Sequence, residues 1–123
     1  MKNYLLPLLL SIMLFSGCNE DKGICNLPED AQPIWVQDLI ADLEGGAAYT
    51  YSFMMTGTYE GQQVFILKNC CPFCASAFPV FTCDGTEIGT IGSEINPNDI
   101  KDEEFYWAPP AVQCAIIGRG GLD

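Results

Sequence analysis

Seven cysteines are the residues of this chain with the clearest capacity for chemistry, and three of them form a Cys-Cys-Pro-Phe-Cys run at Cys70, Cys71 and Cys74. A Cys-x-x-Cys pair carries out thiol–disulfide exchange when the attacking thiolate has a lowered pKa. In such a reaction Cys71 would be the nucleophile and Cys74 the resolving thiol. The run therefore gives one enzymatic hypothesis, a thiol–disulfide oxidoreductase.

The surroundings of this pair resemble the glutaredoxin active site, because a strand-like segment at residues 64–67 leads into Cys-Pro-Phe-Cys. Two features argue against that activity. A low-pKa thiolate of this kind is stabilised at the N-terminus of a helix, yet Pro79 follows Cys74 so closely that a helix there is limited to a turn or two. Glutaredoxins also place a helix, a strand and a second helix where this chain has only residues 75–78. We therefore keep the oxidoreductase as the alternative.

Metal binding is a second chemical use of these side chains. Four thiols lie close together in the sequence, those of Cys70, Cys71, Cys74 and Cys83. Adjacent cysteines ligate one zinc ion poorly, and structural zinc sites use two separated pairs. Three weak calcium candidates with oxygen ligands are Asn98, Asp99 and Asp102. Their order differs from that of an EF-hand, so we expect a solvated acidic face, with no metal and no cofactor.

The N-terminal segment indicates export. Lys2 precedes an apolar run over residues 4–15, which has the length of a signal-peptide core and is too short to cross a bilayer as a helix. The following Ser-Gly-Cys resembles the lipobox of bacterial lipoproteins, which implies cleavage before Cys18 and lipidation of that cysteine. An ordinary signal peptide is the alternative. The acidic pair Glu20-Asp21 resembles the surface-export signal of lipoproteins in Bacteroidota.

A structural role accounts best for the remaining cysteines. After Cys18, six are left: Cys25, Cys70, Cys71, Cys74, Cys83 and Cys114. An even number in a small exported domain indicates a framework of up to three disulfides whose connectivity the sequence leaves open. Adjacent cysteines bond each other only with strained geometry, so Cys70 and Cys71 are expected to bond different partners. Cys25 and Cys114 lie near the two ends and would tie them to the sheet.

Composition excludes several classes of function. The chain has 123 residues, a formal net charge of −11 and no histidine. Nucleic acid is excluded as a partner, because such binding depends on lysine and arginine at phosphates. The absence of histidine excludes Ser-His-Asp and Cys-His catalysis. A hydrophobic content of 49% suffices for the core of a single domain, and the cysteine content indicates an oxidising compartment.

The elements that must hold these cysteines follow from periodicity. A helix is predicted over residues 34–44, because Trp35, Leu39, Ile40 and Leu43 share one face. Alternation predicts strands over residues 49–56, 64–67, 80–83 and 86–91. Asp84-Gly85 predicts a two-residue type I′ turn that sets Phe81 opposite Ile88. A short helix is predicted over residues 96–105 and a last strand over residues 112–117.

Together these elements predict an α+β domain, in which one amphipathic helix packs on a four- or five-stranded antiparallel meander stapled by disulfides. The predicted organisation is a signal peptide (residues 1–17), a lipidated cysteine with an acidic tether (18–32), one domain (33–118) and a flexible tail (119–123).

The order of these features resembles a family. The chain resembles small Bacteroidota lipoproteins with a double-cysteine α+β domain. The shared features, in order, are a helix, a Tyr-rich strand, the strand at residues 59–65, the double cysteine Cys70-Cys71 and the turn at Asp84-Gly85. The resemblance covers about residues 35–91. It implies this fold and an envelope location, and it implies no chemistry.

We therefore expect a monomeric lipoprotein of the bacterial outer membrane, anchored by its lipid and facing the periplasm or the cell surface. Its expected role is a non-enzymatic binding or structural module, with a protein or glycan as a possible partner. An inhibitor or binder of secreted enzymes is a further alternative. Tyr106 and Trp107 beside Pro109-Pro110 could form an exposed aromatic contact, but we favour a position in the core.

Overall fold

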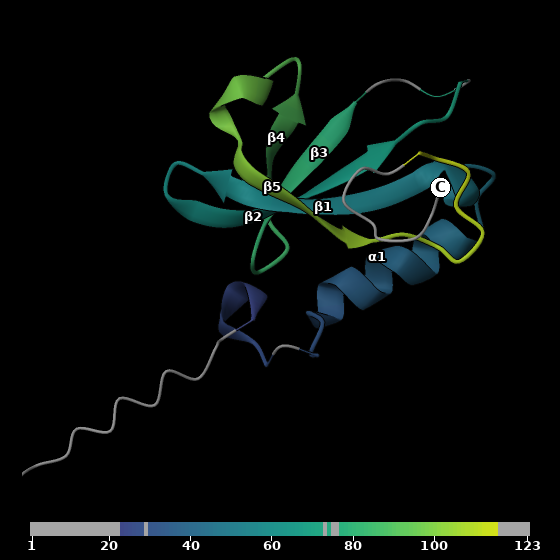
Figure 1. Ribbon diagram of the computed structural model, residues 1–123, viewed down its shortest axis with the longest axis horizontal. Coiled ribbons are helices and arrows are strands. Elements are labelled where there is room, and N and C mark those ends of the chain that lie inside the picture. Colours follow the sequence, from purple (N-terminus) through teal and green to yellow (C-terminus); the bar gives the residue numbers. More distant parts are fainter. Residues whose placement is uncertain (1–22, 29, 73, 75–76, 116–123) are drawn as a thin grey trace, which may run out of the picture.

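The computed structural model describes residues 23–28, 30–72, 74 and 77–115 (Figure 1). Its main elements are α1 (Ile34–Glu44), β1 (Ser52–Tyr59), β2 (Gln62–Asn69), β3 (Phe78–Thr82), β4 (Glu87–Ile91) and β5 (Lys101–Trp107). Three short 3-10 helices are η1 (Ile24–Asn26), η2 (Tyr49–Tyr51) and η3 (Pro97–Asp99). One helix and a five-stranded antiparallel sheet confirm the expected α+β class. Within the described ranges, no helix is long and apolar enough to span a membrane.

The predicted signal peptide, Cys18 and the tail at residues 119–123 lie outside the described residues. The helix has the predicted bounds, with Pro33 before its first residue and Gly45 after its last. The first strand begins later than predicted, because residues 49–51 form a 3-10 turn ahead of it.

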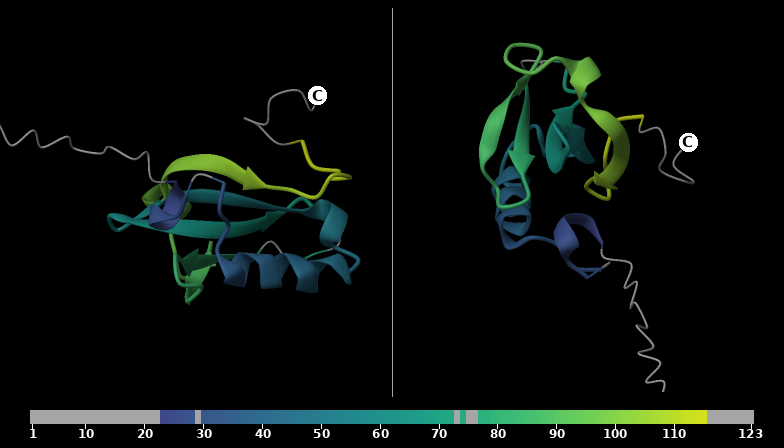
Figure 2. Two further views of the ribbon diagram at one scale, coloured as in Figure 1. Left: turned by 90° about the horizontal axis from the view of Figure 1, so that it is seen from below. Right: turned by 90° about the vertical axis from the view of Figure 1, so that its left-hand side faces the viewer.

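The sheet has the strand order β4-β3-β2-β1-β5, and every neighbouring pair is antiparallel. Strands β1 to β4 form a meander, whereas β5 pairs with β1 at the edge opposite β4. Residues 92–100 connect these two edges, and the sheet curls into an open half-barrel (Figure 2). Strands β1 and β2 form its middle, β3 and β4 form one side, and β5 forms the other side. An isolated bridge between Ile91 and Ile95 begins this crossing.

Each face of the sheet has its own core. The inner face of the curl buries Val64, Ile66, Val80, Ile95 and Ile100. The opposite face packs under α1 and buries Val36, Met54 and Phe65. Because successive side chains of a strand point to opposite faces, β2 supplies both cores in alternation. The two cores explain why β2, at the centre of the sheet, carries an unbroken apolar run.

One glycine permits the crossing from β4 to β5. A Cβ atom on Gly57 would lie 2.8 Å from Cγ2 of Ile100 and 3.1 Å from the backbone oxygen of Lys101. Both distances are shorter than ordinary van der Waals contact, so β5 can approach β1 here only because residue 57 has no side chain.

The helix predicted over residues 96–105 is wrong beyond its first turn. Asn96 caps a turn as expected, since its Oδ1 atom accepts a hydrogen bond from the N–H of Asn98 at 2.9 Å. The chain then forms β5, whose first four residues are charged and exposed. Acidic residues disfavour strands on their own, but pairing with β1 overrides that preference. On an edge strand, these charges also discourage pairing with another chain.

The turn between β3 and β4 also differs from the prediction. The N–H of Thr82 donates to the carbonyl oxygen of Thr86 at 2.9 Å, and the N–H of Gly85 donates to that of Thr82 at 3.0 Å. The loop therefore contains three residues, with Gly85 at φ 89°, as in a type I turn closed by a left-handed residue. One consequence is that Phe81 pairs with Glu87, so the predicted pairing of Phe81 with Ile88 is wrong.

The C-terminal segment carries no strand in its described part. Residues 112–115 form no strand and contain one bend, at Cys114, so the last predicted strand is wrong over this part, and residues 116–117 lie outside the described residues. Tyr106 and Trp107 pack against the core under α1, and the Tyr106 ring lies 5.0 Å from that of Phe65. This position confirms the expected core role of the two aromatic residues.

Candidate functional site

All six cysteines that follow Cys18 are paired in disulfides. The bonds are Cys25–Cys83, Cys70–Cys114 and Cys71–Cys74. Their Cα atoms lie 5.6, 5.8 and 5.2 Å apart, within the usual range for disulfides. The two adjacent cysteines bond different partners, as expected. The four thiols considered for zinc are thus divided among three bonds and do not gather as one set of thiolates.

The Cys71–Cys74 bond lies in the connection from β2 to β3, and both residues are half-buried. The backbone N–H of Cys74 donates to the carbonyl oxygen of Cys71 at 3.4 Å, which closes a tight turn. Because β3 begins at Phe78, there is no room for the long helix whose N-terminus lowers the pKa of a catalytic thiol. Among the described residues of this connection none lies in a helix, so this part of the motif has the pairing of a redox site without a helix to activate it.

The calcium candidates are divided between two elements. Asn98 and Asp99 belong to the region of η3 and Asp102 to β5, and all three are exposed. The ammonium group of Lys101 donates to the backbone oxygen of Asn98 at 2.8 Å, so a cation already occupies this position. Among the residues that the structure describes, no three His, Cys, Asp or Glu side chains are grouped to hold a metal ion.

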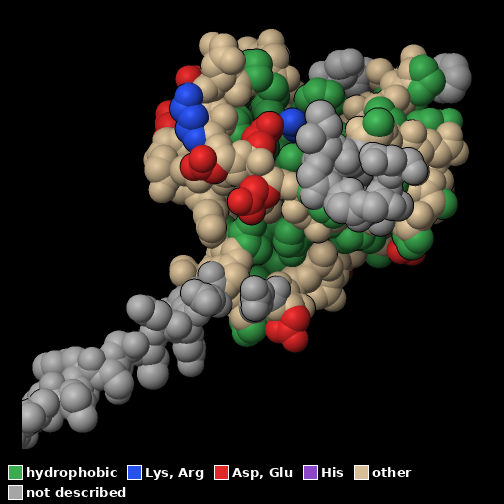
Figure 3. Space-filling model, viewed as in Figure 1, with side chains coloured by type: hydrophobic (Ala, Val, Ile, Leu, Met, Phe, Trp, Pro, Cys, Tyr) green, Lys and Arg blue, Asp and Glu red, His purple; other side chains and the backbone are tan. Residues whose placement is uncertain are grey.

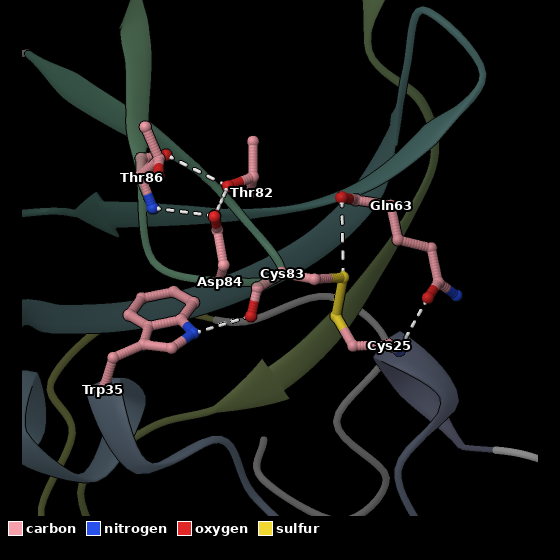
Figure 4. Close-up of a disulfide and its surroundings, with 7 residues drawn as sticks. All are labelled: Cys25, Trp35, Gln63, Thr82, Cys83, Asp84 and Thr86. Atoms are coloured by element: carbon pink, nitrogen blue, oxygen red, sulfur yellow. Dashed lines mark hydrogen bonds between the residues drawn. A yellow bond between two sulfur atoms is a disulfide. The ribbon is translucent and has the colours of Figure 1, made fainter.

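The Cys25–Cys83 bond lies at the junction of three segments, η1, the first turn of α1 and the β3–β4 turn (Figure 4). Two hydrogen bonds fix this junction. The indole N–H of Trp35 donates to the carbonyl oxygen of Cys83 at 2.9 Å. The backbone N–H of Cys25 donates to Oε1 of Gln63 on β2 at 2.6 Å. The segment expected to be a tether is therefore bonded to the sheet at Cys25.

An open groove of about 690 Å³ runs along this junction. Its lining residues are Cys25, Leu27, Gln32, Pro33, Ile34, Trp35, Asp38, Cys83 and Asp84. Ile34 is 76% exposed and is the one large apolar side chain with high exposure in the described part of the chain. The half-buried Leu27 and Trp35 line the same groove, so its lining is largely apolar. We call it the disulfide groove.

Two carboxylates border the apolar surface of the disulfide groove. Asp38 lies one helical turn after Ile34 and therefore on the same side of α1. Asp84 lies in the turn between β3 and β4. Figure 3 shows that apolar side chains are also exposed between the sheet and the N-terminal part of the domain.

The charge of Asp84 is stabilised locally. Its carboxylate accepts a hydrogen bond from the hydroxyl of Thr82 and another from the backbone N–H of Thr86 at 3.2 Å (Figure 4). The bond from Thr82, followed by the bond from Thr86, lowers the pKa of Asp84 below its usual value, because both bonds favour the ionised form. Asp84 therefore remains negative in mildly acidic solution.

The basic residues of the described part of the chain lie elsewhere. Lys68 forms an ion pair with Glu103, with 2.9 Å between Nζ and Oε1. The ammonium group of Lys101 donates a hydrogen bond to the backbone oxygen of Asn98 in η3. Neither borders the disulfide groove. Within the described lining, the negative charge of the groove thus has no positive counterpart.

The sequence did not single out this groove, because its walls come from segments far apart in the chain. One signal was available. Ile34 lies outside the apolar stripe formed by Trp35, Leu39 and Leu43, and an isoleucine outside the stripe of an amphipathic helix points away from the core. From the sequence, Asp84 is predicted only to be a turn residue.

The fold and the groove define a small, disulfide-bonded α+β domain with an apolar, acid-bordered surface. No family model, no curated protein and no solved structure matches this chain.

Proposed function

We propose that this protein is a non-enzymatic binding module of the bacterial envelope, with the disulfide groove as its binding surface. The observation that carries the proposal is the largely apolar groove at Ile34, a side chain that is 76% exposed. Burying an isoleucine side chain contributes about 1.5–3 kcal/mol, so a partner that covers this surface gains substantial affinity. A groove with a mostly apolar lining and a few polar groups at its border is typical of a binding site.

The walls of the groove are fixed before any partner arrives. The Cys25–Cys83 bond joins the N-terminal segment to the β3–β4 turn, and the hydrogen bond from Trp35 joins that turn to the helix. A preorganised surface loses little conformational entropy on binding. This rigidity supports recognition of a partner rather than a role as a spacer.

The proposed anchor would hold the groove near a membrane. Residues 19–22 separate the lipid-carrying Cys18 from Gly23, the first described residue, and five Cα–Cα steps reach at most about 20 Å. The lipobox-like Cys18 and the cysteine-rich composition support location in the envelope, on the periplasmic or the outer side of the outer membrane. The disulfides are compatible with that oxidising environment.

The anchor is tested by metabolic labelling with a palmitate analogue. The wild-type protein incorporates the label and Cys18→Ala loses it together with its membrane association. Undiminished labelling of the variant would contradict lipidation at this residue.

Binding at the groove is tested by selecting a random peptide library against the purified, oxidised protein. The matched variants are Ile34→Gln in the groove and Ala41→Gln, which is exposed on the same helix outside it. We expect selected peptides to lose about tenfold or more in affinity with Ile34→Gln and to bind Ala41→Gln as they bind wild type. If no peptide depends on Ile34, the proposed binding function is wrong.

A second candidate function, thiol–disulfide oxidoreductase, is favoured by one observation, the pairing of Cys71 with Cys74. Alkylation and mass mapping at graded reducing potentials separates the two functions. A structural role predicts that all three bonds resist reduction together. If the Cys71–Cys74 bond alone opens reversibly near about −200 mV, the range of redox catalysts, the oxidoreductase is the better assignment.

A further inference from the structure

We infer that the disulfide groove binds an extended peptide segment of a partner protein, in which an apolar side chain stands next to a lysine or arginine. This inference rests on the proposed binding function and specifies the chemistry of the partner. It draws on the apolar surface around Ile34, on the carboxylates of Asp38 and Asp84 that border it, and on the place of Trp35 in the wall.

The carboxylates select a positively charged partner. Asp38 borders the groove from the helix and Asp84 from the β3–β4 turn, and the lysines of the described residues are engaged elsewhere. The whole chain has a formal net charge of −11, so its long-range field attracts cations and repels anionic surfaces. An anionic lipid headgroup is therefore a poor occupant.

The apolar surface fits the stem of the same basic side chain. Lysine and arginine lay their methylene groups along apolar surface while the charged end remains in water or meets a carboxylate. Ile34 would contact such a stem and the neighbouring apolar residue of the peptide, because it is the exposed apolar member of the lining, and Asp38 would meet the charged end. A peptide thus uses both features of the groove at once.

The position of Trp35 argues against a glycan. Sugar rings stack on an open aromatic face, but the ring of Trp35 lies against Phe65 and Phe81 at centroid distances of 5.2 and 5.3 Å. The β3–β4 turn covers it further, since a Cβ atom on Gly85 would lie 2.7 Å from Cγ of Trp35. Its indole N–H is also already bonded to Cys83. Trp35 therefore acts as part of the wall.

The test uses three fluorescent peptides of equal length and measures their binding by anisotropy. One alternates leucine with lysine, the second replaces each lysine by glutamate, and the third replaces each leucine by serine. We expect saturable binding of the leucine–lysine peptide alone. Its affinity should fall about two- to fivefold when one carboxylate is removed, as for an exposed charge pair, and should fall further as salt is raised.

The matched variants are Asp38→Asn in the groove and Asp42→Asn, an exposed aspartate of the same helix that does not border it. We expect Asp38→Asn to weaken binding and Asp42→Asn to leave the affinity within error of wild type. Asp84→Asn removes the second carboxylate and so gives an independent test. The fold of this variant is checked by circular dichroism, because Asp84 also stabilises its turn. Equal effects of Asp38→Asn and Asp42→Asn would overturn the inference.

Other outcomes identify other occupants. If the glutamate peptide binds as well as the lysine peptide while both depend on Ile34, the binding function stands and the inferred chemistry is wrong. Binding to phosphatidylglycerol vesicles that Ile34→Gln abolishes would identify a lipid surface instead. A dimer that Ile34→Gln dissociates in sedimentation would identify a second copy of the chain.

Discussion

The three disulfides should contribute unequally to stability, because they close loops of very different length. The bonds Cys25–Cys83, Cys70–Cys114 and Cys71–Cys74 span 58, 44 and 3 residues. A cross-link restricts the unfolded chain by an entropy that grows with the logarithm of the loop length. At room temperature that relation gives about 4.2, about 4.0 and about 1.6 kcal/mol of stabilisation for the three bonds.

The assay is urea unfolding of three double variants, each replacing both cysteines of one bond by serine so that no free thiol remains. With a slope of about 1 kcal/mol per molar urea, loss of Cys71–Cys74 lowers the midpoint by about 1.6 M. Loss of either long-range bond lowers it by about 4 M. A variant that is unfolded without urea is measured in trimethylamine N-oxide, which favours the compact state.

The result that would refute this reasoning is a loss from Cys71→Ser/Cys74→Ser as large as that from Cys25→Ser/Cys83→Ser. Such a loss would mean that the short bond stabilises the native connection from β2 to β3 by contacts, and that loop closure is not its main effect. A control with the reduced wild type should lose at least as much stability as any double variant.

Three further predictions concern single residues and use urea unfolding. Gly85→Ala should destabilise more than Gly61→Ala, because both glycines have positive φ (89° and 79°) but only the Cβ at residue 85 meets another side chain. Gly61→Ala gives the strain alone, about 1–2 kcal/mol, and equal losses would contradict the contact with Trp35. Gly57→Ala should lower the free energy of unfolding by about 1–3 kcal/mol, because the new methyl group overpacks against the crossing to β5. An unchanged midpoint would mean that the crossing moves to make room for the methyl group. The lowered pKa of Asp84 means that its stabilising effect is complete above the unfolded pKa and is lost as the pH falls through the lower folded pKa. Below about pH 4, the midpoint of Asp84→Asn should therefore depend less on pH than that of wild type, and parallel curves would contradict this.

Local patterns were sufficient to predict the elements with strong local signals. The helix could be placed because an apolar stripe, Pro33 and Gly45 mark its face and both ends. The central strands followed from alternation. β5 was missed because its charged first half resembles a solvated helix turn after the true cap at Asn96, and only its pairing with β1 makes it a strand.

The register and the site depended on information that is not local. The three-residue loop at Gly85 differs from a two-residue turn by one residue, and that difference changes the partner of Phe81. The disulfide partners are set by which loops meet, as Cys25 and Cys83 do. The groove joins a segment before the helix, the helix itself and a hairpin turn, so no stretch of sequence contains it.

The order of the three disulfides along the chain has a mechanical consequence. A covalent path leads from Cys25 to Cys83, back along the backbone to Cys74, across to Cys71, and through the neighbouring Cys70 to Cys114. The backbone part of this path is only about ten residues, or about 34 Å when fully extended, and the three disulfides add Cα–Cα spans of 5.6, 5.2 and 5.8 Å. A force that pulls the two ends of the domain apart therefore cannot extend it beyond this covalent path while the bonds hold. The load passes through the short Cys71–Cys74 bond, so the turn that this bond closes does not carry it.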